Sequence, residues 1–115
     1  MNETLPREQF APAEIVFGIG EPGDSAYVIE SGCVEILAGA SQGSIAVLGA
    51  GELFGEVALL DQQPRTATVR TLEATTLVRI ERGHVNELLK RSDPVIRHLM
   101  TLLLERFRST HPGHV

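Results

Sequence analysis

The residues best suited to chemistry lie between positions 54 and 69, where a Gly-Glu pair opens a short apolar stretch and a Pro-Arg-Thr-Ala run follows a brief polar loop. Glu56 has two acceptor oxygens, which suit the hydroxyl donors of a sugar. Arg65 has a rigid planar fork that matches two phosphate oxygens, a geometry that lysine lacks. One carboxylate and one guanidinium are therefore expected to lie close together, where they suit a ligand with both hydroxyl groups and a phosphate.

The backbone of this segment also suits an anion. The apolar stretch is expected to form a short helix whose first amides, near Val57 and Ala58, are unpaired and carry a partial positive charge. Gly55 lets a ligand approach the backbone closely because it has no Cβ atom. The small residues Thr66 and Ala67 leave their amides accessible. A cyclic phosphate fused to a ribose is one of the few ligands that needs a carboxylate, a guanidinium and free amides together.

Short apolar segments separated by glycine must position these groups. Strand-like length and alternation occur at about 26–30, 32–37, 44–48, 66–71 and 75–80. Many short strands with frequent turns predict a mainly β fold with C-terminal α-helices, in which an antiparallel jelly-roll barrel spans about 14–80. Strand alternation predicts that the side chains of Ile36 and Ile45 both face inward.

Two helices are expected after the strands, at about 82–91 and 94–109. Asp93 can cap the second helix, and Pro94 suits its first position. This helix carries more apolar residues than the stripe of about 100° that packing on the sheets requires. The surplus predicts a second contact, with another copy of the chain in a homodimer or with an effector protein, although simple core packing is an equal alternative.

Length and composition indicate a single cytoplasmic domain over 1–115. The chain has 115 residues, of which 43% are hydrophobic and 22% charged, as is ordinary for one globular domain. Its formal net charge of −5 argues against a nucleic-acid-binding surface. No apolar run approaches the roughly 18 residues of a membrane span, and the N-terminus lacks a secretory signal. The lone Cys33 fits a reducing compartment and is interpreted as a small strand residue.

The positions of the histidines argue against a cupin-like metalloenzyme, which would need imidazoles on its strands. All four histidines follow the strand region: His84, His98, His111 and His114. No metal site is therefore expected, and no Ser/His/Asp or Cys/His arrangement can be assembled. We expect neither an enzyme nor a bound cofactor.

Residues 54–69 resemble the phosphate-binding cassette of cyclic nucleotide-binding domains, which occur in bacterial catabolite-type regulators, cyclic-nucleotide-dependent kinases and cyclic-nucleotide-gated channels. In that family Phe-Gly-Glu, a short apolar helix and Pro-Arg-(Ser/Thr/Ala)-Ala follow one another, and here they match without a gap. Residues 20–32 resemble the early turn and strand of the family, and the two C-terminal helices fit its order. The resemblance covers about 10–109.

The resemblance implies a role for each cassette residue. Glu56 would bind the ribose 2′-hydroxyl and Arg65 the cyclic phosphate, while Ile36 and Ile45 would flank the base. The other residues implied in ligand binding belong to the cassette itself: Phe54, Gly55, Val57, Ala58, Thr66 and Ala67. A threonine after the arginine often accompanies recognition of cyclic GMP in this family, but it does not decide between cyclic AMP and cyclic GMP.

The implied function is a non-enzymatic cytoplasmic sensor that binds cyclic AMP or cyclic GMP and relays occupancy through its C-terminal helices. Both ends depart from the family pattern, since about ten residues with two prolines replace most of the first helical segment and Pro112-Gly113 stops the last helix. One alternative is an interaction module with the same fold that no longer responds to a nucleotide. Another is that Glu56 and Arg65 only pair with each other and staple a loop.

Overall fold

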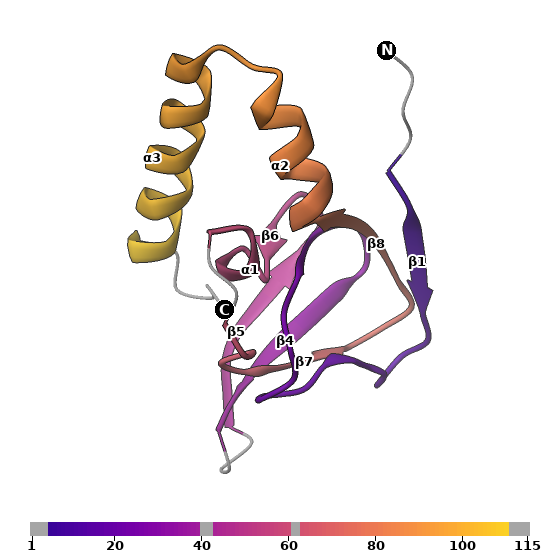
Figure 1. The fold of residues 1–115 in the computed structure, drawn as a ribbon. Helices are drawn as coiled ribbons and strands as arrows, with labels where there is room; N and C mark the ends of the chain where they lie inside the picture. The colour runs from indigo at the N-terminus through magenta and orange to yellow at the C-terminus, as the bar shows by residue number, and fades with distance from the viewer. Residues whose placement is uncertain (1–4, 40–42, 61–62, 111–115) are drawn as a thin grey trace.

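The computed structural model describes residues 5–39, 43–60 and 63–110. Within them are two four-stranded antiparallel sheets, one short helix between two strands and two helices after the last strand (Figure 1). One sheet has the order β1 (Arg7–Phe10), β8 (Thr75–Glu81), β3 (Ser25–Ser31) and β6 (Leu53–Phe54). The other has the order β2 (Ile15–Phe17), β7 (Thr68–Thr71), β4 (Cys33–Ala38) and β5 (Gly43–Gly49). The helices are α1 (Val57–Leu60), α2 (Arg82–Lys90) and α3 (Pro94–Thr110).

The mainly β fold with C-terminal helices is confirmed, but the sheets do not close into a barrel. Among the described residues, no strand of one sheet pairs with a strand of the other. The sheets instead enclose one core as a jelly-roll-like sandwich, because their inward-facing side chains pack together. The fully buried apolar members of this core are Ile29, Val34, Ile36, Phe54, Val69 and Leu77. Closure of the sheets is therefore the part of the predicted architecture that was wrong.

The sheets begin before position 14, where the sequence predicted the first strand. Arg7–Phe10 forms β1 by pairing with β8, in a register that places Arg7 opposite Val78 and Phe10 opposite Thr75. Phe10 packs against the core, whereas Pro6 and Pro12 flank the strand without interrupting it. This short edge strand depends on tertiary pairing, which a polar sequence without a period does not reveal.

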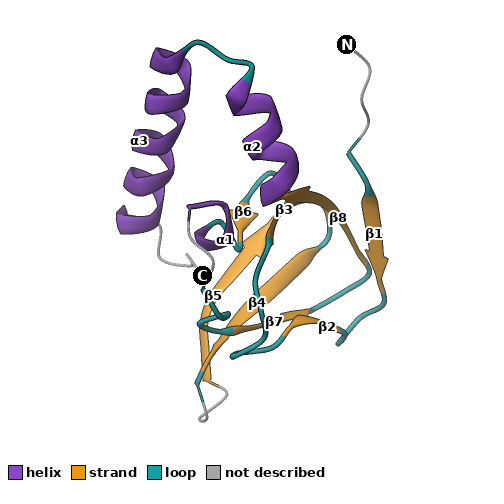
Figure 2. Cartoon of the chain, in the orientation of Figure 1, coloured by secondary structure: helices purple, strands orange, loops and turns teal. Residues whose placement is uncertain are grey.

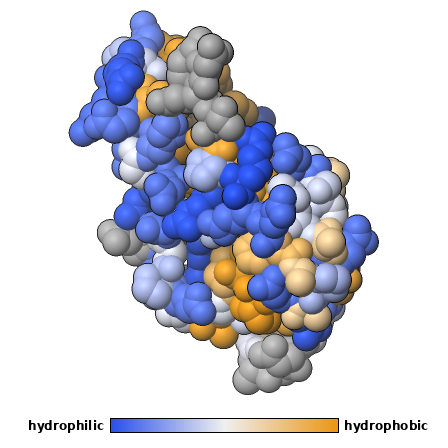
Figure 3. All heavy atoms as spheres, turned by 90° about the vertical axis from the view of Figure 1, so that its right-hand side faces the viewer, coloured by the Kyte–Doolittle hydropathy of each residue, from blue (hydrophilic) through white to orange (hydrophobic). Residues whose placement is uncertain are grey.

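The β4–β5 hairpin corrects the expected orientation of Ile45. Ile36 lies opposite Ala46 and is fully buried in the core. The register then shifts, so that Leu37 lies opposite Ser44 and the pairing skips Ile45. Ile45 and Val47 alternate with Ala46 and are 53% and 59% exposed. On a different face of the molecule, hydrophobic side chains gather in the lower half of the view in Figure 3. The prediction that Ile45 faces inward is therefore wrong.

The helices lie together beside one end of the sheets (Figure 2). α2 contacts both β8 and α1, and α3 contacts α1 and α2. Asp93 caps α3 as predicted, because its carboxylate accepts a hydrogen bond from the Val95 amide at 2.8 Å. Over the part of the chain that is described, no helix is both long enough and apolar enough to cross a membrane.

Gly32 forms the turn between β3 and β4 with a backbone φ of +98°. A Cβ atom there would overlap Thr75 Oγ1 and lie 2.6 Å from the Ala74 carbonyl oxygen. We expect Gly32→Ala to lower the free energy of unfolding by about 2–4 kcal/mol, because left-handed backbone and overpacking each carry a cost. Gly49→Ala is the control, since a Cβ there meets nothing within 4 Å. Equal losses in both variants on urea denaturation would contradict this account.

Candidate anion-binding site

Arg65 lies at the centre of the candidate site, and its backbone is bonded to the turn that precedes β3. The Arg65 amide donates to the Glu21 carbonyl at 2.7 Å, and its carbonyl accepts from the Gly20 amide at 2.8 Å. Pro22 and Pro64 form an isolated antiparallel bridge beside these bonds. The cassette and the early turn, which are far apart in the sequence, therefore form one structural unit.

The Arg65 side chain extends inward, and its direct contacts are with neutral groups. It is only 7% exposed. Nη2 donates to the Ser25 carbonyl at 2.7 Å, and Nη1 donates to the Gly55 carbonyl at 3.4 Å. Arg65 Cζ lies 3.9 Å from the centroid of the Phe17 ring. The guanidinium is thus bound by backbone oxygens and an aromatic face.

Burial lowers the pKa of the Arg65 guanidinium, although the nearby Tyr27, Asp24 and Glu21 act in the opposite direction. The group remains a cation at neutral pH because the ordinary pKa of arginine lies far above neutrality. Among the described residues, no carboxylate forms an ion pair with it, and Nε has no hydrogen-bond partner. A desolvated cation in these surroundings would be stabilised by an anion.

Two glycines make room for the Arg65 side chain. A Cβ atom at Gly23 would lie 3.0 Å from Arg65 Nε, and one at Gly55 would lie 3.1 Å from Arg65 Nη1. Gly55 also has a φ of +75°, which residues with a Cβ rarely adopt. Gly55, which was expected to let a ligand approach the backbone, therefore also leaves space for the Arg65 side chain.

An aromatic cluster supports the site from the core. The ring centroids of Phe17 and Phe54 are 6.0 Å apart, and those of Tyr27 and Phe54 are 5.4 Å apart. Phe54, which the resemblance implied in ligand binding, is fully buried in this cluster. It lies beneath the site rather than at its surface.

Glu56 is fully buried and directly follows Gly55 at the start of α1. The Ala58 amide donates to the Gly55 carbonyl at 3.2 Å, because α1 is a single turn that closes on that oxygen. The expectation of an unpaired Ala58 amide is therefore wrong in this structure. Within the described residues, Glu56 belongs to no group of three or more His, Cys, Asp or Glu that could hold a metal.

The remaining expected residues divide between the cassette and the core. Val57 is half-buried, Thr66 is exposed and Ala67 is 2% exposed. Ile36 belongs to the core between the sheets, and Ile45 faces outward. The expected set omitted the Phe17 ring and the Ser25 carbonyl, which contact Arg65, and Gly23, which leaves space for it. The Gly-Glu-Pro-Gly-Asp-Ser turn was the only signal for Gly23 and Ser25 in the sequence, and Phe17 lies outside it.

Burial raises the pKa of Tyr27 in the aromatic cluster, and the charge of Glu8 adds to this effect. A tyrosine with a raised folded-state pKa stabilises the fold below its unfolded pKa of about 10, and this contribution is lost as the pH rises through the folded-state value. We expect wild type to lose more free energy of unfolding than Tyr27→Phe between pH 8 and 11. Urea denaturation at both pH values measures the difference, and equal losses would refute the assignment.

Comparison with known proteins agrees with this geometry. Residues 7–92 match the family described as the cyclic nucleotide-binding domain. A CRP-like cAMP-activated global transcriptional regulator of Mycobacterium tuberculosis is 29% identical over 114 residues, which cover 96% of this chain and 51% of that protein. A cAMP-dependent protein kinase regulatory subunit of Yarrowia lipolytica is 35% identical over 86% of this chain and 26% of its own length.

Among solved structures, the half-site-occupied form of the EAL enzyme Bd1971 is 38% identical, with a TM-score of 0.77 over 92% of this chain and 97% of that one. The present chain spans about half the length of the first of the curated relatives named above. The family match covers every strand of both sheets, the whole cassette and α2. The chain therefore belongs to the cyclic nucleotide-binding domain family.

Proposed function

We propose that this chain is a sensor that binds a cyclic mononucleotide, cyclic AMP or cyclic GMP, with Arg65 on the cyclic phosphate and Glu56 on the ribose. The observation that carries the proposal is the buried Arg65 guanidinium, whose described contacts are all with neutral groups. Relatives named for cAMP and for cGMP both match, so the two purines remain alternatives.

The physical basis is the exchange of neutral partners for a charged one. Hydrogen bonds from a guanidinium to phosphate oxygens are roughly twice as strong as those between neutral groups. An anion would also offset the cost of desolvating the cation. Ser25 and Gly55 contribute only carbonyl oxygens to the present contacts, so a phosphate can replace them without separating an ion pair.

The proposed binding residues are those of the cassette, with one correction. The amides near Gly55, Val57, Thr66 and Ala67 complete the anion site, and the Ala58 amide joins them only if α1 opens. Ile36 lies on the inner face of β4 and supports the pocket for the base, whereas Ile45 is not proposed because it faces solvent. This role of the chain is regulatory and needs no metal, cofactor or nucleic acid, and we place it in the cytoplasm.

Occupancy of the site is proposed to reach the C-terminal helices through α1. The Arg82 amide at the start of α2 donates to the Asp24 carbonyl at 2.8 Å, and Arg82 Nη1 donates to the Ala58 carbonyl at 3.5 Å. α2 is therefore joined both to the turn before β3 and to α1. A nucleotide that moves α1 would shift α2 and α3, and coupling of this kind is typically worth about 1–3 kcal/mol.

We expect Arg65→Ala to weaken binding of the preferred nucleotide by about 2–5 kcal/mol, because the phosphate loses its buried cationic partner. Isothermal titration of nucleotide-free protein with cyclic AMP and cyclic GMP measures the change. Arg70→Ala is the matched control, because it removes an arginine that pairs with Glu35 at 2.6 Å instead of contacting Arg65. Unchanged affinity in Arg65→Ala would refute the assignment of the phosphate.

The same titration tests the alternative function. If folded, nucleotide-free wild type binds neither nucleotide, the sensor proposal fails. An interaction module that keeps the fold without its ligand would then be the better account.

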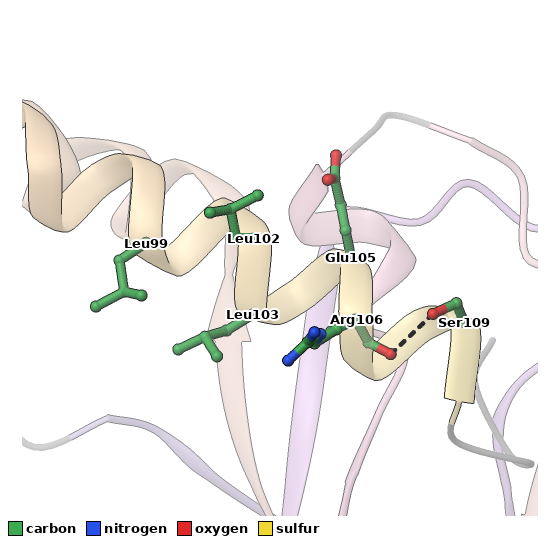
Figure 4. A pocket seen from close by; sticks show the side chains of 6 residues that line it. All are labelled: Leu99, Leu102, Leu103, Glu105, Arg106 and Ser109. Carbon is green, nitrogen blue, oxygen red and sulfur yellow. Dashed lines mark hydrogen bonds between the residues drawn. The ribbon is translucent and has the colours of Figure 1, made fainter.

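We also propose that α3 contacts a second copy of the chain. Val95, Leu99 and Leu102 recur at intervals of four and three residues on one helix face, and they are 72%, 48% and 47% exposed. Figure 4 shows a hollow along α3 that is lined by Leu99, Leu102, Leu103, Glu105, Arg106 and Ser109. Pairing of two such faces would bury apolar surface that a monomer leaves in water.

We expect wild type to be dimeric and Leu99→Glu/Leu103→Glu to be monomeric, because a carboxylate in an apolar helix pair is not solvated. Size-exclusion chromatography with light scattering measures the masses. Arg97→Glu is the control, because it introduces the same charge on another face of α3. A monomeric wild type would refute self-association and leave an effector protein as the proposed partner of this face.

A further inference from the structure

The Arg65 guanidinium rests on an aromatic ring that comes from a distant part of the chain. Arg65 Cζ lies 3.9 Å from the centroid of the Phe17 ring, well within the separation of about 6 Å at which a cation is attracted to a ring face. Both side chains are buried, with Phe17 4% and Arg65 7% exposed. Cation–π attraction is strongest for such desolvated pairs.

The position of the Phe17 ring is fixed by its strand and by its neighbours. The register between β2 and β7 shifts between Ile15 and Phe17, and a shift of this kind redirects a side chain. Ile15 is 51% exposed, whereas Phe17 faces the core. There its ring packs at 6.0 Å from Phe54 and 6.2 Å from Tyr27, so the ring is a rigid support for the cation.

A ring contact constrains a guanidinium differently from a hydrogen bond. It uses the face of the planar cation, whereas the N–H donors point outward from its edges. Arg65 Nε has no hydrogen-bond partner among the described residues, and both terminal nitrogens donate to neutral carbonyls. The ring can therefore hold the cation in place while its edges exchange backbone oxygens for oxygens of an anion.

We propose that Phe17 is a positioning residue for anion binding, because its ring holds the Arg65 guanidinium in the orientation that receives the phosphate. The inference rests on the proposed function. It also goes beyond core packing, because a residue that only fills the core would affect stability without a specific link to Arg65. Leucine at this position would fill much of the space and provide no aromatic face.

The first test compares Phe17→Leu, Phe17→Tyr and Phe10→Leu by isothermal titration with cyclic AMP and cyclic GMP. Loss of the ring face should weaken binding by about 5- to 30-fold in Phe17→Leu, whereas Phe17→Tyr should stay within about threefold of wild type. Phe10→Leu is the control, because it removes a ring that packs on the core and does not contact Arg65. Its affinity should be unchanged.

The second test needs no nucleotide. Urea denaturation of Phe17→Leu, Arg65→Ala and the double variant forms a double-mutant cycle, and the two substitutions should be non-additive if the residues interact. If Phe17→Leu does not fold, Phe17→Met replaces it in both tests, since methionine is a flexible apolar residue of similar size.

The outcomes separate this inference from the proposed function. Wild-type binding with unchanged affinity in Phe17→Leu would overturn the role of Phe17 alone, as would additive substitutions in the cycle. Equal weakening in Phe17→Leu and Phe10→Leu would also overturn it, because that result reports general core damage. A wild type that binds neither nucleotide would overturn the proposed function and the positioning role with it.

Discussion

Burial of a single guanidinium constrains much of this domain. A cation removed from water needs acceptors for its N–H groups, and Arg65 obtains them from the Ser25 and Gly55 carbonyls. Its side chain also needs space, which Gly23 and Gly55 provide because they have no Cβ atom. The guanidinium also packs on the ring of Phe17, which belongs to the core. Residues from three separate parts of the chain thus meet around one side chain.

This arrangement has a cost that a ligand can offset. The contacts of Arg65 are with neutral groups, so its positive charge is desolvated without an ion pair among the described residues. Asp24 and Glu21 lie near enough to act on this charge, but among the described residues neither forms an ion pair with it. In the proposed function a phosphate would supply this missing charged partner, because hydrogen bonds from a guanidinium to phosphate oxygens are stronger than those between neutral groups.

The same turn links the site to the helices. Glu21 and Gly20 bind the Arg65 backbone, and Asp24 accepts a hydrogen bond from the Arg82 amide at the start of α2. α1 belongs to the cassette and contacts β3, α2 and α3. A one-turn helix with few hydrogen bonds of its own can change its arrangement more easily than a long helix, because little local structure is lost. The short length of α1 is therefore consistent with a mobile connection.

Local signals made the mainly β class, the two C-terminal helices and the family predictable. Glycine-separated alternation indicated strands, Asp93-Pro94 indicated a helix start, and the cassette motif is continuous in the sequence. The open edges of the two sheets were not predictable, because strand patterns specify which face is buried but not which strands pair. For the same reason the sequence did not reveal β1, because this strand pairs with β8 at the opposite end of the sheet region.

By itself, the sequence determined the chemical groups of the candidate site, because Glu56, Arg65 and the cassette glycine are close together along the chain. Tertiary structure alone decided what surrounds them. It placed Phe17 under the guanidinium and turned Ile45 outward. The physical reason is that these features depend on register shifts and on packing between distant segments, whereas a motif records only neighbours along the chain.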